Sequence, residues 1–106
     1  MATWIVTRHP GALQWMRRQG VVATRVVAHL DTNEIADGDE VIGTLPVPLV
    51  AEVCARGARY LHLRINMPVE LRGKELTEDQ MNAMDAALEE FSVCRGHLAG
   101  SSIPKG

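Results

Sequence analysis

Short β-rich runs alternate with helices that a proline opens and a glycine closes, and this alternation constrains the fold more than any other feature. Thr3–Thr7 predicts a first strand, followed by a helix that begins at Pro10 and ends just before Gly20. A second helix is expected to open at Pro46 and to end at Gly57. Alternating strands and helices predict a single three-layer α/β domain with a mainly parallel sheet of about four or more strands.

Three more strands are expected, at Thr24–Leu30, Glu40–Leu45 and Arg59–Asn66. The polar connection Asp31–Asp39 between the first two of these is short, because a parallel crossover needs roughly a dozen residues or more. A hairpin between the second and third strands, and therefore a mixed sheet, is the alternative.

A third helix is expected near the end of the chain. Thr77 with Gln80 forms a capping-box pattern, and Gly96 is a natural stop. Apolar side chains recur between them at helical spacing and are expected in the core: Met81, Met84, Leu88 and Phe91. The domain is therefore expected over residues 1–96, with a flexible tail over 97–106.

Charge and composition exclude several classes of protein. The net charge of -2 argues against a general coat of long nucleic acids, but nine of the eleven cations are Arg, which suits a local phosphate or carboxylate site. No apolar run approaches the roughly 18 residues that a membrane span needs, and no signal peptide is evident. A cytoplasmic protein without membrane contact is therefore expected. Cys54 and Cys94 lie in predicted helices and are expected to be buried thiols in a reducing compartment.

The turn after the first strand is the first candidate site, because ligands of open α/β sheets bind at the carboxyl ends of the strands. Arg8 and His9 stand just before a helix N-terminus, where unpaired N–H groups attract anions. Gly11 would let a ligand approach the backbone. A phosphate would then meet N–H groups, a guanidinium and an imidazole. The alternative is a solvated Arg8 and a His9 that merely caps the helix.

Two further segments carry polar side chains near strand ends. Alternation in Arg59–Asn66 puts Leu61, Leu63 and Ile65 on one face and Tyr60, His62, Arg64 and Asn66 on the other. A polar face on this strand predicts a cleft, a subunit interface or an edge strand. Leu71–Leu76, which contains Arg72, Gly73 and Lys74, is either a phosphate-gripping loop or a charged surface turn.

Metal and cofactor motifs are not evident. His29 and Asp31 could join His9 or His62 around a metal, but histidines from separate segments form no recognised zinc pattern. Neither a P-loop nor a GxGxxG is present. No metal and no cofactor are predicted.

Three blocks of the chain together resemble a family of small CRISPR-associated proteins encoded beside type III systems. The blocks are Thr7–Ala12 with Trp15, Gly38–Pro46, and Arg56–Tyr60 through Leu71–Leu76. The family is regarded as standalone ring nucleases related to CARF domains. The resemblance implies a Rossmann-like (CARF-like) homodimer that binds cyclic oligoadenylate, with the tetra-adenylate as the expected ring. It also implies that the protein linearises the ring and so switches off the messenger.

Cleavage on this interpretation needs no metal, because a ribose 2′-OH can attack its own 3′-phosphate. We assign His9 as general acid or base, Arg8 as phosphate clamp, and Lys74 (or Arg72) as the group that stabilises developing charge. The residues expected to hold the ring are Thr7, Gly11, Thr44, Arg64, Asn66, Arg72 and Gly73.

Three other functions stay open. The protein could be a sponge that sequesters the ring without cutting it, or an adaptor whose polar strand face docks a protein. The Arg8-His9 pair is also similar to the strand-end Arg-His-Gly of histidine phosphatases, although Pro10 interrupts that motif and the chain is about half the size such a fold needs.

Overall fold

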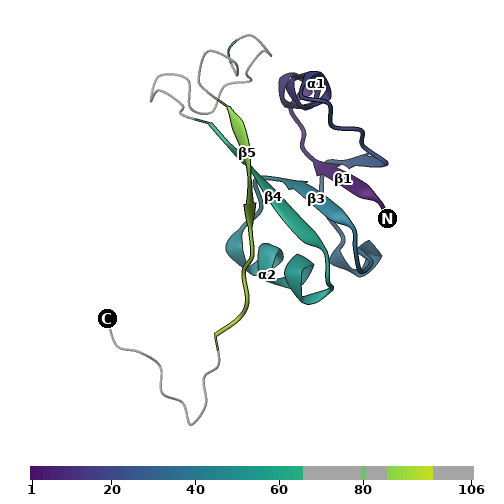
Figure 1. Ribbon diagram of the computed structural model, residues 1–106, viewed down its shortest axis with the longest axis vertical. Coiled ribbons are helices and arrows are strands. Elements are labelled where there is room, and N and C mark those ends of the chain that lie inside the picture. The colour runs from purple at the N-terminus through teal and green to yellow at the C-terminus, as the bar shows by residue number, and fades with distance from the viewer. Residues whose placement is uncertain (66–79, 81–85, 97–106) are drawn as a thin grey trace, which may run out of the picture.

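The computed structural model describes residues 1–65, 80 and 86–96, which form a sheet with one helix packed on each face (Figure 1). The strand order is β2-β1-β3-β4-β5. Neighbours pair in parallel except β4 and β5, which are antiparallel. The strands are β1 (Thr3–Val6), β2 (Arg25–Val27), β3 (Glu40–Gly43), β4 (Arg59–Arg64) and β5 (Ala87–Phe91), and the helices are α1 (Pro10–Arg18), α2 (Val47–Ala55) and the short 3₁₀ turn η1 (Thr32–Glu34).

Two hydrophobic clusters lie on opposite faces of the sheet, which confirms the predicted three layers. Neighbouring residues of one strand enter different clusters, as the two-residue repeat of a strand requires. Trp4 packs with the α2 residues Val50 and Val53, whereas Ile5 packs with Trp15 and Met16 of α1. Trp4 and Trp15 are both almost fully buried, so they are core residues, as predicted.

The proline and glycine boundaries of both predicted helices are confirmed. Pro10 is the first residue of α1, and Pro46 is the N-cap of α2. Gly20 and Gly57 follow the helix ends with φ of 90° and 84°. Glycine adopts this left-handed conformation without the steric cost that a Cβ imposes, so these two positions end the helices.

The mainly parallel sheet is confirmed, and the alternative of a hairpin between β2 and β3 is wrong. Both strands pair in parallel with β1, one on each side of it. The expected second strand extended to Leu30, but β2 ends at Val27, which leaves residues 28–39 for the connection. A segment of that length can cross over β1. Within it, the Asp31 carboxylate accepts the Asn33 N–H at 3.0 Å and so caps η1.

The predicted third helix is wrong from Ala87 onward, because this segment forms β5. Phe91 pairs with Tyr60 and Leu88 with Leu63 across the antiparallel ladder. Leu88 packs at the edge of the α1-side cluster, whereas Phe91 is 46% exposed and is not in the core. The free backbone groups of β4 explain the difference, since the ladder they form outweighs the local helix preference of the Ala, Leu and Glu residues of this segment. Thr77, Met81, Met84 and the tail over 97–106 lie outside the described residues.

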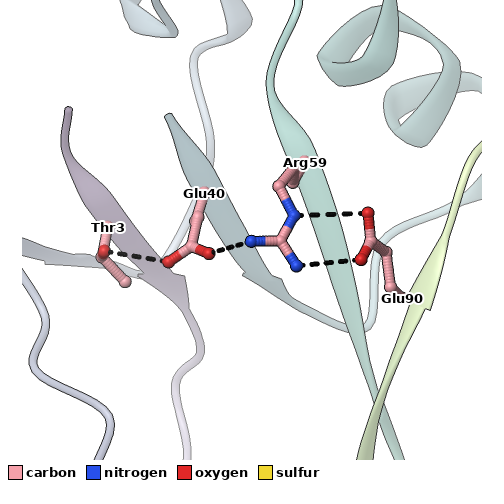
Figure 2. Close-up of polar contacts among 4 residues, drawn as sticks. All are labelled: Thr3, Glu40, Arg59 and Glu90. Atoms are coloured by element: carbon pink, nitrogen blue, oxygen red, sulfur yellow. Dashed lines mark hydrogen bonds and ion pairs between the residues drawn. The ribbon is translucent and has the colours of Figure 1, made fainter. Parts of the chain in front are cut away.

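A row of polar side chains joins four strands at the amino edge of the parallel strands (Figure 2). Arg59 on β4 donates to Glu40 on β3 at 2.7 Å and makes a two-point contact with Glu90 on β5 at 2.8 and 3.3 Å. Glu40 in turn accepts from the Thr3 hydroxyl on β1 at 3.4 Å. The Arg59 hydrogen bond and positive charge lower the pKa of Glu90. The row therefore helps to hold β5 in register with the parallel strands.

A buried carboxylate, Asp39, anchors the first residues of the chain. It accepts the N–H groups of Ala2 and Ala36 at 2.8 and 3.0 Å and the indole N–H of Trp4 at 3.1 Å. The hydrogen bond from the Ala2 N–H, and after it the one from the Ala36 N–H, lower the pKa of Asp39 below its usual value. Burial of the carboxylate opposes this effect. With three donors around it, this carboxylate is a structural group.

The two cysteines differ from the prediction. Both are free, but Cys54 in α2 is half-buried, and Cys94 follows β5 and is exposed. Cys94 is therefore neither helical nor buried, because the helix expected to bury it is replaced by the edge strand. Within the described residues, no helix is long and apolar enough to cross a bilayer.

Candidate functional site

A polar pocket of about 410 Å³ lies at the carboxyl ends of β1, β2 and β3. We call it the strand-end pocket. Its polar lining residues are Thr7, Arg8 and His9 after β1, His29 after β2 and Thr44 after β3. From β1 the chain turns to β2 through α1, and from β3 it turns the other way to β4 through α2. Such a reversal of direction at the carboxyl edge is where open α/β sheets bind ligands.

The turn after β1 is fixed by backbone hydrogen bonds. The Thr7 N–H donates to the Val27 carbonyl at 2.9 Å, and the Thr7 hydroxyl accepts the His9 N–H at 3.1 Å. The His9 carbonyl accepts the N–H groups of Ala12 and Leu13 at 3.1 and 3.3 Å, while its imidazole makes no capping bond. The His9 backbone therefore caps the helix, and the exposed His9 ring can make other contacts.

The N-terminus of α1 supplies fewer anion donors than the sequence suggested. Pro10 has no N–H, and the N–H groups of Ala12 and Leu13 are already bonded to His9. Gly11 is buried in the first turn and is not among the described residues that line the strand-end pocket. The affinity of this pocket for an anion must therefore come mainly from the Arg8, His9 and His29 side chains.

His29 also lines the strand-end pocket, although the sequence suggested it only as a metal ligand. The β1–β2 register pairs Val6 with Val27, so the segments that follow the two strands lie side by side. His9 and His29 consequently line the same pocket. One neutral imidazole can accept a proton while a charged one donates a proton, and a pocket with two can do both. His29's position at a predicted strand end was the available signal.

Arg8 adds a positive charge to this pocket. Its side chain is exposed, and none of the described acidic residues forms an ion pair with it. A guanidinium without an internal partner can contact two oxygens of a phosphate at once. Among the described residues, no group of three His, Cys, Asp or Glu side chains could hold a metal ion.

The far wall of the pocket, the turn after β3, is held by Tyr60. The Tyr60 hydroxyl donates to the Gly43 carbonyl at 3.0 Å and accepts the Leu45 N–H at 2.9 Å. The side chain is 2% exposed, and this burial raises the pKa of the phenol. The sequence placed Tyr60 on a polar strand face, whereas the structure places it in the core as the support of this turn.

Gly43 brings β3 close to β1 beneath the pocket. A Cβ at this position would lie 2.9 Å from the Val6 carbonyl oxygen, which is backbone and cannot rotate away. Only glycine fits there without moving the strand ends apart. The pocket floor thus depends on a residue without a side chain.

The structure assembles part of the predicted site. Thr7, Arg8, His9 and Thr44 come together in the strand-end pocket, as expected. Arg64 does not line it and instead forms an ion pair with Glu89 on β5. The edge-strand interpretation of β4 is wrong, because β3 and β5 flank it. The predicted residues Asn66, Arg72, Gly73 and Lys74 lie outside the described residues.

Comparison with protein families matches residues 4–94 to a family described as "Putative CRISPR-associated protein (Cas_VVA1548)". No curated protein and no solved structure gives a significant match.

Proposed function

The chain belongs to this family of CRISPR-associated proteins, and we propose that it acts there as a ring nuclease, which binds cyclic oligoadenylate and linearises it without a metal. The observation that carries the proposal is one pocket with two imidazoles and a guanidinium that forms no ion pair with the described acidic residues. These groups, from His9, His29 and Arg8, come from the ends of two adjacent strands. They are the groups that a phosphodiester cleavage by proton transfer requires.

The reaction would use a nucleophile that the substrate itself carries. The ribose 2′-oxygen forms a bond to the adjacent phosphorus, and the bond from that phosphorus to the 5′-oxygen of the next nucleotide breaks. The 2′-OH proton passes to one imidazole, and the other imidazole gives a proton to the departing 5′-oxygen. The products are a 2′,3′-cyclic phosphate and a 5′-hydroxyl, so atoms and charge balance.

Each described side chain has a role in this reaction. Arg8 clamps the phosphate and neutralises charge on its non-bridging oxygens as the transition state forms. His9 and His29 share the base and acid roles. Thr7 and Thr44 carry hydroxyls that can hold phosphate or ribose oxygens at the two sides of the pocket. Lys74 and Arg72 stay in the proposal as further cations, and their variants belong in the same assay.

A cyclic oligoadenylate repeats the same phosphate around a near-symmetric ring, so a two-fold homodimer with two copies of the pocket is the expected binding form. Only a few cations per subunit then face the ring. The net charge of -2 is therefore compatible with an anionic ligand.

The test is incubation of the full chain with cyclic tetra-adenylate in EDTA, with the products followed by chromatography. We expect linear products from the wild type. Arg8→Ala, His9→Ala and His29→Ala should each lower the rate by roughly 10²–10⁴-fold. Arg17→Ala is the matched control, because Arg17 is an exposed arginine of α1 that does not line the pocket.

Other outcomes support the alternatives. An intact ring that co-migrates with the protein indicates a sponge. An intact, unbound ring leaves another ring size, a metal requirement or the adaptor. Release of inorganic phosphate from p-nitrophenyl phosphate indicates a histidine-phosphatase-like enzyme. If all three pocket variants cleave at the wild-type rate while folded, the strand-end pocket is not the active site.

A further inference from the structure

A second, smaller pocket lies on the α2 face of the sheet, next to the strand-end pocket. Its volume is about 200 Å³, and Leu45 lines both pockets. Val47 and Val50 of α2 form one wall, and Phe91 and His62 contribute on the strand side. We call it the His62 pocket. Its size suits a single ring system rather than a larger ligand.

The His62 pocket concentrates exposed apolar side chains. The described part of the chain has five large hydrophobic side chains that are exposed, and Val47 and Phe91, at 67% and 46%, are two of them. The His62 and Phe91 rings meet edge to face, with centroids 5.7 Å apart and planes at 90°. Flat, apolar walls of this kind favour an aromatic ligand.

The hydrogen bonds of Tyr60 determine which nitrogen of His62 carries the proton. Three groups lie within bonding distance of the Tyr60 hydroxyl: the Leu45 N–H, the Gly43 carbonyl, and Nδ1 of His62 at 2.7 Å. The N–H can only donate and the carbonyl can only accept. All three contacts are hydrogen bonds when the hydroxyl donates to Gly43 and His62 Nδ1 donates its own proton to the hydroxyl, so the geometry favours this tautomer.

Neutral His62 with its proton on Nδ1 has a lone pair on Nε2. Within the described residues, no hydrogen bond is made to this atom. His62 lines the pocket beside apolar side chains, and its Nε2 is the ring nitrogen that can accept a hydrogen bond from a ligand. A ligand that fits must be flat and must present a donor.

We propose that the His62 pocket binds a nucleobase that carries an exocyclic amino group, with that group donating to His62 Nε2. The proposal rests on the proposed function in one respect, since the phosphate of the same nucleotide would lie in the adjoining strand-end pocket. Phe91 would contact the ring of the base. A purine without that amino group has no N–H donor on its ring and would bind more weakly.

The test compares adenosine with purine riboside, which lacks only this amino group; neither nucleoside carries a phosphate. Both are titrated into the full chain with ¹⁵N-labelled histidine at pH 7, and the His62 ring signals and the dissociation constants are measured by NMR. We expect Nε2 to be the unprotonated nitrogen and to shift on addition of adenosine. Adenosine should bind about tenfold more tightly than purine riboside, which is the effect of one good hydrogen bond.

Two variants and a control complete the experiment. His62→Phe keeps an apolar ring but removes the acceptor, and should abolish the preference for adenosine. Phe91→Ala should weaken both nucleosides about tenfold or more. Val22→Ala changes an exposed valine that lines neither pocket and should alter nothing. Thermal unfolding of each variant shows whether it is folded.

Equal affinity for the two nucleosides, or a protonated Nε2, would overturn the proposal, as would adenosine signals that shift outside the pocket. The two proposals fail separately. Cleavage of cyclic tetra-adenylate without adenosine selectivity leaves the ring nuclease and removes the base pocket. Adenosine selectivity without cleavage or ring binding leaves the base pocket and removes the ring nuclease.

Discussion

The hydrogen bonds that Asp39 accepts are expected to contribute to the stability of the fold. Asp39→Asn keeps the size but removes the charge that three N–H donors share, so we expect a loss of about 1–3 kcal/mol in the free energy of unfolding. Asp37→Asn, two residues away and exposed, is the control and should have little effect. Urea denaturation at pH 7 measures both. A change no larger than that of the control would contradict the structural role of Asp39.

Acid should affect the wild type and Asp39→Asn differently. The pKa of Asp39 is lower in the folded chain than its ordinary value of 3.8, so the unfolded chain takes up the proton first. Its contribution is complete above the unfolded pKa and is lost as the pH falls through the folded one. Wild type should therefore lose more stability than Asp39→Asn between pH 5 and pH 3, measured by denaturation at each pH. Parallel losses in the two proteins would contradict this.

Gly43 is a second residue with a sharp expected effect. Gly43→Ala places a methyl group against the Val6 carbonyl, so β1 and β3 must separate under the strand-end pocket. We expect a loss of about 1–3 kcal/mol in stability and weaker ligand binding. Gly96→Ala is the control, because a Cβ there meets nothing within 4 Å. Thermal unfolding of the two variants tests this prediction. Equal melting temperatures would contradict the close approach of Gly43 to the Val6 carbonyl.

At the scale of single residues, the sequence predicted those pocket residues that lie at the ends of strands. Arg8 and His9 follow one predicted strand and Thr44 lies near the end of another, and the rule that ligands bind at strand ends placed them at one pocket. Tyr60 supports a turn fifteen residues earlier, and Asp39 binds the start of β1. These contacts depend on which strands pair and in what register, and no local pattern contains that information.

At the scale of elements, β5 is the clearest departure from the sequence pattern. Ala87–Phe91 consists mainly of Ala, Leu and Glu, which favour helices, and its apolar residues Leu88 and Phe91 are three positions apart. Two adjacent glutamates also break the alternation that marks a strand. The segment is a strand because β4 offers it a ladder of free backbone groups and Arg59 a partner for Glu90. Both are non-local.

NMR can check this element directly. We expect cross-strand contacts between the backbone protons of Tyr60 and Phe91 and of Leu63 and Leu88, which the antiparallel register brings together. A helix would instead give contacts between protons three residues apart within Ala87–Phe91. Observation of that helical pattern would contradict β5.

At the scale of the whole molecule, the sheet divides the protein into two edges. Ligand binding at the carboxyl edge should stabilise the whole domain, because the unfolded chain has no pocket. Cyclic tetra-adenylate at a hundred times its Kd should add about 2.7 kcal/mol. In a domain of this size that raises the melting temperature by roughly 10–20 °C. Arg8→Ala should show little of this shift and Arg17→Ala all of it. An unchanged melting temperature of the wild type would contradict binding.

The separation of the two edges also determines how substitutions combine. The strands that join them span roughly 10–15 Å, which is beyond the distance at which substitutions usually influence one another. The polar row and Asp39 lie at one edge, and the strand-end pocket lies at the other. A double variant such as Asp39→Asn with Arg8→Ala should lose the stability of the first and the binding of the second, with no added penalty. The amino edge can therefore change in sequence, within the limits of stability, while the chemistry at the carboxyl edge stays the same.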